Sequence, residues 1–182
     1  MKKFMMIAAM MLMSIGAFAQ QGTTSLGVNV GYAGYGNSYN PFGIGAKLQY
    51  EFIENWRGEF AYNYWFPKDK AGVMDFNLNV QYLFPIAENF KIYPTVGFTL
   101  GMTHGDLYKQ IFDGQESIPG FNIGCGVEYK LTPELKLNAD VKYQSCSKTK
   151  SYTETFQGQV YSVDYKLKYD GPLVQVGISY IF

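Results

Sequence analysis

The stretch Val174–Phe182, with the sequence VQVGISYIF, decides the fold of this chain. Every second residue from Val174 to Phe182 is apolar, and most of the residues between them are small or polar. A two-residue period is that of a β-strand, whose side chains point alternately to opposite faces. The stretch therefore predicts a strand with one complete apolar face that ends on an aromatic residue.

The same alternation occurs seven more times before this strand. The earlier predicted strands are Leu26–Tyr32, Phe42–Phe52, Trp56–Phe66, Met74–Phe84, Ile92–Met102, Phe121–Leu131 and Leu135–Tyr143. Pro94 lies within the fifth of them and is expected to cause a local irregularity, because proline has no N–H to donate to a neighbouring strand. The sequence thus predicts eight strands of about ten residues, the length that a tilted strand needs to cross a bilayer.

The connections between the predicted strands alternate in length. Short turns follow the second, fourth and sixth strands, whereas longer segments follow the others: Gly34–Asn40, Pro67–Val73, Thr103–Pro119 and Cys146–Gly171. Within the last segment, Tyr152–Gly158 and Val160–Tyr169 are predicted to form a hairpin. The sequence Asp170-Gly171-Pro172 then changes the phase of the alternation, which predicts a bulge or kink.

The first 19 residues have a different pattern. Lys2 and Lys3 precede an apolar run from Phe4 to Leu12, and Ala17-Phe18-Ala19 places small residues at the positions that a signal peptidase reads. The apolar run is shorter than the roughly 20 residues that a membrane-spanning helix needs. Residues 1–19 are therefore predicted to be a cleaved signal peptide, and residues 20–182 a single barrel domain.

Two kinds of eight-stranded barrel fit this pattern, and the residues on each face separate them. A soluble barrel of the lipocalin type would turn the apolar stripes inward, whereas a transmembrane barrel turns them outward between two aromatic girdles. Rings gather toward the short turns at Tyr50, Phe52, Trp56, Tyr82, Phe84, Tyr129, Tyr180 and Phe182, and toward the loops at Tyr32, Phe42, Tyr64, Phe66, Phe76, Phe121 and Tyr143. The opposite face combines glycines with charged residues, which suits a narrow interior. The sequence predicts an all-β, eight-stranded antiparallel up-and-down transmembrane β-barrel.

With its leader, its alternating loop lengths and its terminal Phe182, the chain resembles the small outer-membrane β-barrels of Gram-negative bacteria, of the OmpA membrane-domain, OmpX and porin-like types. The resemblance covers residues 20–182. It implies a location in the bacterial outer membrane, contact with outer-membrane lipid, and both termini in the periplasm. It also implies that the barrel-assembly machinery reads a terminal signal that includes Tyr180 and Phe182.

The predicted inward face carries charges of both signs. These residues are expected to form a lumen charge network: Lys47, Glu51, Arg57, Glu59, Asp75, Glu128, Asp140 and Lys142. The three-residue turn Ile53–Asn55 places Glu51 opposite Arg57 and Gln49 opposite Glu59, and the next hairpin is expected to place Trp65 opposite Asp75. Eight strands leave room for little more than side chains, so a closed barrel without a continuous pore is predicted.

The two cysteines are predicted to be free thiols. Pairing Leu131 with Leu135 places Cys125 opposite Val141, five residues from Cys146. At about 3.3 Å per residue this is roughly 16 Å along the strand, too far for a disulfide. Cys125 is expected to face lipid.

The sequence contains no strong catalytic or metal-binding motif. His104, Asp106 and a serine such as Ser117 or Ser151 could be combined into a hydrolase or acyltransferase site, but no motif fixes their geometry. We expect no enzyme activity, no cofactor and no metal. A nucleic-acid partner is not expected either, because removal of Lys2 and Lys3 leaves 13 basic and 15 acidic residues, without an excess of positive charge.

The functional alternatives left open by the sequence concern the loops and the lumen. A structural role in the envelope, binding of a protein partner through the surface loops, or both, fit the chain equally. Adhesion or host interaction through Cys146–Gly171 is an alternative, because loops on a rigid scaffold often carry binding. A narrow porin and a lipid A-modifying enzyme are further alternatives.

Overall fold

The computed structural model describes residues 22–35, 40–68, 71–104, 116–156 and 159–182, so the predicted leader lies outside the described residues. The strands are β1 (Thr23–Ala33), β2 (Phe42–Ile53), β3 (Trp56–Lys68), β4 (Ala71–Tyr82), β5 (Phe84–Ala87), β6 (Phe90–His104), β7 (Ser117–Thr132), β8 (Leu135–Phe156) and β9 (Gln159–Ile181). Among these residues, no helix is long and apolar enough to cross a membrane.

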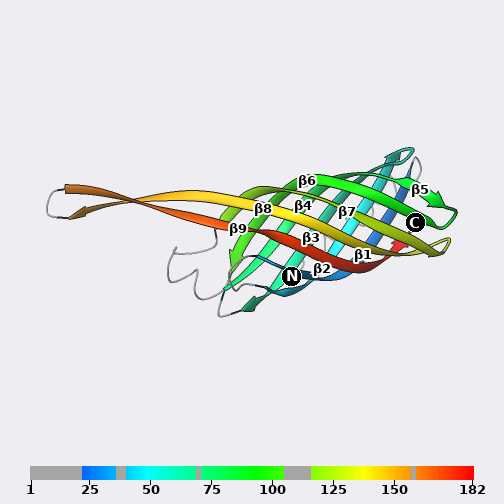
Figure 1. Ribbon diagram of the computed structural model, residues 1–182, viewed down its shortest axis with the longest axis horizontal. Coiled ribbons are helices and arrows are strands. Elements are labelled where there is room, and N and C mark those ends of the chain that lie inside the picture. The colour runs from blue at the N-terminus through cyan, green and yellow to red at the C-terminus, as the bar shows by residue number, and fades with distance from the viewer. Residues whose placement is uncertain (1–21, 36–39, 69–70, 105–115, 157–158) are drawn as a thin grey trace, which may run out of the picture.

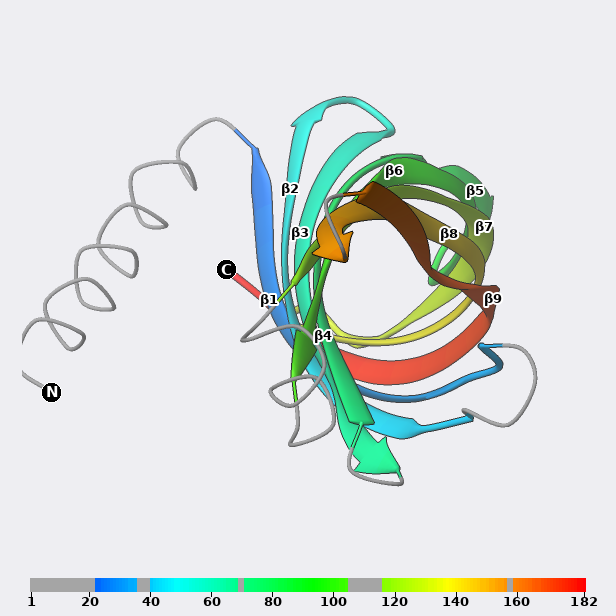
Figure 2. The ribbon, with the colours of Figure 1, turned by 90° about the vertical axis from the view of Figure 1, so that its left-hand side faces the viewer.

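The strands form one closed antiparallel barrel (Figures 1 and 2). Neighbours in sequence pair with each other, β1 pairs with β9, and β4 pairs with β6, which closes the sheet. β5 continues β4 along β6, because Gln81 lies opposite Thr95 and Phe84 opposite Ile92 in the same register. The barrel therefore has the eight strands that the sequence predicts.

The break between β4 and β5 lies where Pro94 faces this strand. In the register that Gln81 and Phe84 share, Pro94 of β6 falls opposite Tyr82. Pro94 cannot donate a backbone hydrogen bond, and the ladder is interrupted here, while the N–H of Leu83 donates to the carbonyl oxygen of Asn55 at 2.7 Å. The predicted irregularity is thus seen in the neighbouring strand. Residues Pro85–Ala87 lie in the short turn that was predicted after the fourth strand, but they belong to strand β5.

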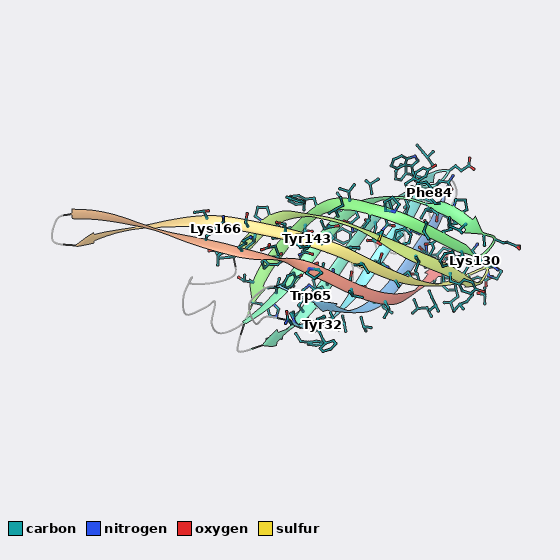
Figure 3. The ribbon with its side chains drawn as sticks, viewed as in Figure 1. Tyr32, Trp65, Phe84, Lys130, Tyr143 and Lys166 are labelled. Atoms are coloured by element: carbon teal, nitrogen blue, oxygen red, sulfur yellow. The ribbon has the colours of Figure 1, made fainter. Side chains whose placement is uncertain are left out.

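The apolar stripes point outward, as Figure 3 shows. Phe42, Val28 and Phe121 are 69 %, 60 % and 62 % exposed, whereas Asn29 and Asn122, which follow Val28 and Phe121 on the inward face, are buried. The lipocalin alternative, with an apolar interior along the whole barrel, is therefore wrong. Lipid requires apolar side chains on the outward face and the lumen accepts polar ones on the inward face, which is why residues alternate along the part of each strand that crosses the bilayer.

The largest difference from the sequence prediction concerns Cys146–Gly171, whose described residues, 146–156 and 159–171, are strand and not loop. β8 and β9 pair without interruption from Leu135 opposite Tyr180 to Phe156 opposite Gln159. Residues 147–156 and 159–168 form a two-stranded extension, the β8–β9 ribbon, that projects beyond the barrel along its long axis (Figure 1). The predicted hairpin lies within this ribbon, apart from residues 157–158, which are outside the described residues, and Tyr169, which is buried in the barrel.

The predicted bulge at Asp170–Pro172 is absent, because this part of the β8–β9 register has no shift. The phase of the apolar residues changes for another reason. Val174 and Val176 point outward, whereas Tyr169 and Leu173 are buried inside the barrel. The interior thus becomes apolar at the end of the barrel that carries the ribbon.

Two other predicted loops are shorter than expected. β6 reaches His104 and β7 begins at Ser117, within the predicted loop Thr103–Pro119. The N–H of Thr103 donates to the carbonyl oxygen of Glu116 at 3.0 Å. Lys68 pairs with Ala71, so most of the predicted connection Pro67–Val73 is also strand.

Candidate functional site

The lumen holds a first charge cluster around Arg57, near the short turns. Arg57 of β3 is fully buried and donates from Nε to Gln81 Oε1 at 2.6 Å and from Nη1 to Glu128. Lys136 Nζ donates to the same Glu128 oxygen at 3.3 Å. The guanidinium also lies 4.7 Å from the ring centroid of Tyr93, within the range of a cation–π contact.

A second cluster lies around Glu59, which is also fully buried. Lys142 Nζ is 3.2 Å from Glu59 Oε1, and Lys47 Nζ is 4.0 Å from Glu59 Oε2. The side-chain amides of Gln49 and Asn79 donate to the two Glu59 oxygens at 2.7 and 2.8 Å. The carboxylate therefore has partners from β2, β4 and β8.

Asp140 joins this cluster to the opposite wall. Lys47 Nζ donates to Asp140 Oδ2 at 3.1 Å, and the Tyr93 hydroxyl donates to Asp140 Oδ1 at 2.8 Å. Buried charges are costly unless they are paired and hydrogen-bonded, and these contacts supply both from three strands. The charges connect the walls of the barrel to each other.

Asp75 is held differently, by neutral donors. The Nδ2 group of Asn63 donates to Oδ1 at 2.8 Å, and Asn77 Nδ2 and Trp65 Nε1 donate to the same carboxylate. Trp65 lies opposite Val73, and Asp75 lies opposite Asn63. The predicted pairing of Trp65 with Asp75 is therefore wrong by two residues, which is one step along the inward face. The indole reaches the carboxylate diagonally.

Toward the ribbon from Asp75, the interior holds a cluster of buried apolar side chains, which we call the apolar cap. The cap consists of Ala33, Tyr35, Trp65, Val73, Ile118, Cys146, Tyr169 and Leu173. The Tyr35 ring lies edge-on to Tyr169 and Trp65, with centroids 5.1 and 6.1 Å away. A Cβ atom on Gly43 would lie 2.5 Å from Trp65 Cε3, so glycine at this position leaves room for the indole.

The structure buries seven of the eight residues of the predicted charge network and leaves Glu51 half-buried at the mouth. Glu51 is opposite Arg57 and Gln49 opposite Glu59, as the turn predicts. Lys136, which alternates in phase with Asn138 and Asp140 and contacts Glu128, also belongs to this network, although it is not one of the eight predicted residues. Of the apolar cap, the sequence predicts only Trp65 to point inward, because most of the other cap residues fall in segments that were predicted to be loops.

Both cysteines are free. Cys125 lies opposite Val141, as predicted, and is exposed on the outer face. Cys146 is buried in the apolar cap. The register that separates the two thiols is therefore confirmed.

The proposed catalytic constellation is not assembled by the residues that the structure describes. The His104 ring stacks on Tyr64 with centroids 4.7 Å apart, and Ser117 starts β7 opposite Met102. Asp106 lies outside the described residues, and the side chain of Ser151 is not among the described ones. His104 thus has an aromatic neighbour on the barrel wall.

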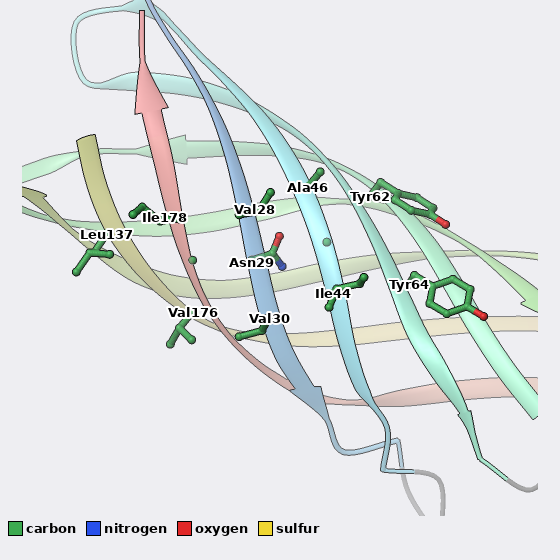
Figure 4. A pocket seen from close by; sticks show the side chains of 12 residues that line it. Val28, Asn29, Val30, Ile44, Ala46, Tyr62, Tyr64, Leu137, Val176 and Ile178 are labelled. Atoms are coloured by element: carbon green, nitrogen blue, oxygen red, sulfur yellow. The ribbon is translucent and has the colours of Figure 1, made fainter. Parts of the chain in front are cut away.

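On the outer face, an apolar hollow crosses β9, β1, β2 and β3 (Figure 4). Val28, Ile44, Ala46, Val176 and Ile178 line it, with the Tyr62 and Tyr64 side chains along one side. Its lining is almost entirely apolar and continuous with the outward stripes. The hollow belongs to the surface that faces the hydrocarbon of a membrane.

The base of the ribbon is polar on its outward face. Ser147, Thr149, Lys166 and Lys168 are exposed, and the register pairs Ser147 with Lys168 and Thr149 with Lys166. Lys168 Nζ lies 3.1 Å from Asp170 Oδ1, while Lys148 Nζ lies 2.8 Å from Glu116 Oε2. The second contact ties β8 to the segment before β7.

Comparison with known proteins shows which family this chain belongs to. The attachment invasion locus protein of Yersinia enterocolitica is 25% identical over 163 residues, which cover 80% of this chain and 88% of that protein. Neisserial surface protein A has a similar structure, with a TM-score of 0.63, 15% identity and coverage of 89% of this chain and 97% of that one.

The attachment invasion locus protein Ail of Yersinia pestis, in complex with the heparin analogue sucrose octasulfate, also has a similar fold. It matches with a TM-score of 0.54 and 16% identity over 89% of this chain and 99% of that one. The sequence model of one family matches residues 5–182. The chain belongs to the outer membrane protein beta-barrel domain family.

Proposed function

We propose that this outer-membrane barrel is a non-enzymatic surface-attachment protein, in which the barrel is a closed anchor and the β8–β9 ribbon is the binding element. The uninterrupted pairing from Leu135 opposite Tyr180 to Phe156 opposite Gln159 carries the proposal. It makes a two-stranded projection out of a segment that could have been an irregular loop. In this assignment the short turns and both termini face the periplasm, and the ribbon faces outward.

The chemistry at the base of the ribbon favours an anionic polymer as the ligand. Exposed Lys166 and Lys168 lie two residues apart on one strand, about 6.6 Å along it, beside the hydroxyl groups of Ser147 and Thr149. Two related proteins support this choice: one is named for attachment and invasion, and another was solved with a heparin analogue. A sulfated polysaccharide is the ligand class we infer.

Shortening the ribbon is expected to abolish attachment without unfolding the barrel. Replacing Ser147–Lys168 by Asn-Gly removes the ribbon together with Lys166, Lys168 and the hydroxyl groups beside them, and leaves Cys146 opposite Tyr169, joined by a two-residue turn of a type that suits hairpins. Binding of intact cells to immobilised heparin should fall to the level of cells without the protein. Heat-modifiable gel migration, which reports a folded barrel, should be retained.

The matched control keeps the ribbon and removes the two exposed positive charges at its base. In the double variant Lys166→Gln and Lys168→Gln, binding should weaken and lose most of its dependence on salt, because salt screens exposed charges. Unchanged binding by the shortened variant would contradict the attachment function. If that variant instead sensitises cells to detergent, a structural role in the envelope would be favoured.

We also propose that the lumen does not conduct. The Arg57 and Glu59 clusters cross the interior, and the apolar cap, with fully buried Trp65, closes the end next to the ribbon. In a planar bilayer the wild-type protein should show no stable steps of porin size. Regular, long-lived openings of the wild type would instead support the narrow-porin alternative.

A further inference from the structure

The outer edge of β8 in the ribbon has no neighbouring strand among the residues that the structure describes. The ladder between β7 and β8 ends at Gly120 opposite Cys146, while β8 continues to Phe156 with only β9 beside it. An edge strand presents a row of unpaired N–H and C=O groups. This edge can therefore accept another strand.

The devices that commonly protect an edge strand are weak here. Residues 149–156, with the sequence TKSYTETF, contain no proline and no glycine. Their pairing with β9 has no bulge. Three threonines and two aromatic residues favour extended structure. Lys150 and Glu154 are charged, but because their signs are opposite they do not give the edge a single charge that would repel another strand.

These residues are complementary to themselves when two copies pair antiparallel about Tyr152. In that register Lys150 lies opposite Glu154 of the second copy, and the symmetry repeats this pair on the other side. The hydroxyl residues also meet: Thr149 lies opposite Thr155 and Ser151 opposite Thr153. Opposite charges, hydroxyl pairs and aromatic pairs on facing strands each stabilise a sheet.

The neighbouring registers are less favourable. A shift of two residues in one direction places Lys150 opposite Phe156, and a shift in the other places it opposite Tyr152. The second shift would need Lys148 as the partner of Glu154, yet Lys148 already forms an ion pair with Glu116 at 2.8 Å. The Tyr152-centred register leaves that ion pair intact.

We propose that the free edge of β8 binds the same edge of a second copy of this protein, forming a four-stranded sheet in the order β9-β8-β8-β9. Because the ribbon points away from the barrel (Figure 1), antiparallel pairing places the two barrels at opposite ends of that sheet. Copies in one membrane cannot meet in this way. The contact joins two membranes, and it requires no polysaccharide, so it is independent of the attachment function.

Charge variants test the contact, because each is incompatible with itself and compatible with the other. Cells that display Lys150→Glu, and cells that display Glu154→Lys, should each lose the aggregation seen with wild type. Mixed one to one in two fluorescent colours, they should form aggregates that contain both colours. Trypsin sensitivity of the ribbon on intact cells and heat-modifiable migration check display and folding.

A cross-link tests the register. Directly opposed residues in an antiparallel pair have Cα atoms about 4.5–5.5 Å apart, which a disulfide can span. Tyr152→Cys should give an oxidised dimer between separately labelled cell populations, whereas Thr149→Cys and wild type should not. Aggregation of either charge variant alone, failure of the mixture, or no Tyr152→Cys dimer on displayed protein would overturn the proposal.

Discussion

Replacing Glu59 with alanine is expected to lower the free energy of unfolding by about 3–5 kcal/mol, the usual effect of removing one partner from a buried ion pair. Lys142 loses the carboxylate 3.2 Å from its Nζ, and Lys47 keeps only Asp140. Gln49 and Asn79 lose their acceptor as well. Urea unfolding of the folded protein in detergent, followed by tryptophan fluorescence, measures the change.

Glu54→Ala is the matched control for this variant. Glu54 is a carboxylate in the exposed turn between β2 and β3, and exposed substitutions usually change stability by less than about 0.5 kcal/mol. Equal unfolding free energies for Glu59→Ala and Glu54→Ala would show that the lumen charges do not stabilise the barrel.

Replacing Arg57 with alanine should have an effect of similar size, about 3–5 kcal/mol. Sequence reasoning would assign this loss to Glu51 and Glu59, but the structure assigns most of it to Glu128, which accepts from Arg57 Nη1. Gln81 Oε1 loses its donor and the Tyr93 ring loses its cation. Lys136 is left as the neighbouring cation of Glu128.

The measurement for Arg57→Ala is the unfolding temperature in detergent. Lys166→Ala, an exposed cation at the base of the ribbon, should leave that temperature nearly unchanged. Arg57→Lys separates charge from geometry, because lysine cannot reproduce the contacts of guanidinium to Gln81, Glu128 and Tyr93 together. An unfolding temperature equal to that of wild type for Arg57→Ala would contradict the role of the cluster.

The strands inside the bilayer could be predicted because lipid and lumen impose opposite requirements on alternate residues. Val28 and Phe121 must be apolar, while Asn29 and Asn122 can be polar. Toward the ribbon the outward face becomes polar and the inward face forms the apolar cap. The alternation of apolar residues therefore changes phase between Leu173 and Val174. In the sequence alone, a phase change without a bulge looks the same as a loop between two strands.

The ion pairs of the lumen also fall into two groups, those that the sequence predicts and those that it does not. Glu51 and Arg57 face each other across one tight turn, so the register of a single hairpin predicts their proximity. Lys47 and Asp140 are 93 positions apart, and Arg57 and Glu128 are 71 apart. Which residues meet across the lumen depends on strand tilt and stagger around the whole barrel, and no local pattern in the sequence contains that information.

The seam between β1 and β9 joins the first and last strands of the barrel, with Leu26 opposite Tyr180 and the N–H of Phe182 donating to Thr24. Contacts between such distant segments form slowly, because a long loop must close before they are made. Until the seam closes, the inner face of an inserted sheet would expose Lys47, Glu59 and Asp140 to hydrocarbon, which is costly. Closure shields these charges and brings their cross-lumen partners together at once. The polar interior thus links stable insertion to closure of the seam, because an open sheet in the membrane would leave these charges without their partners in hydrocarbon.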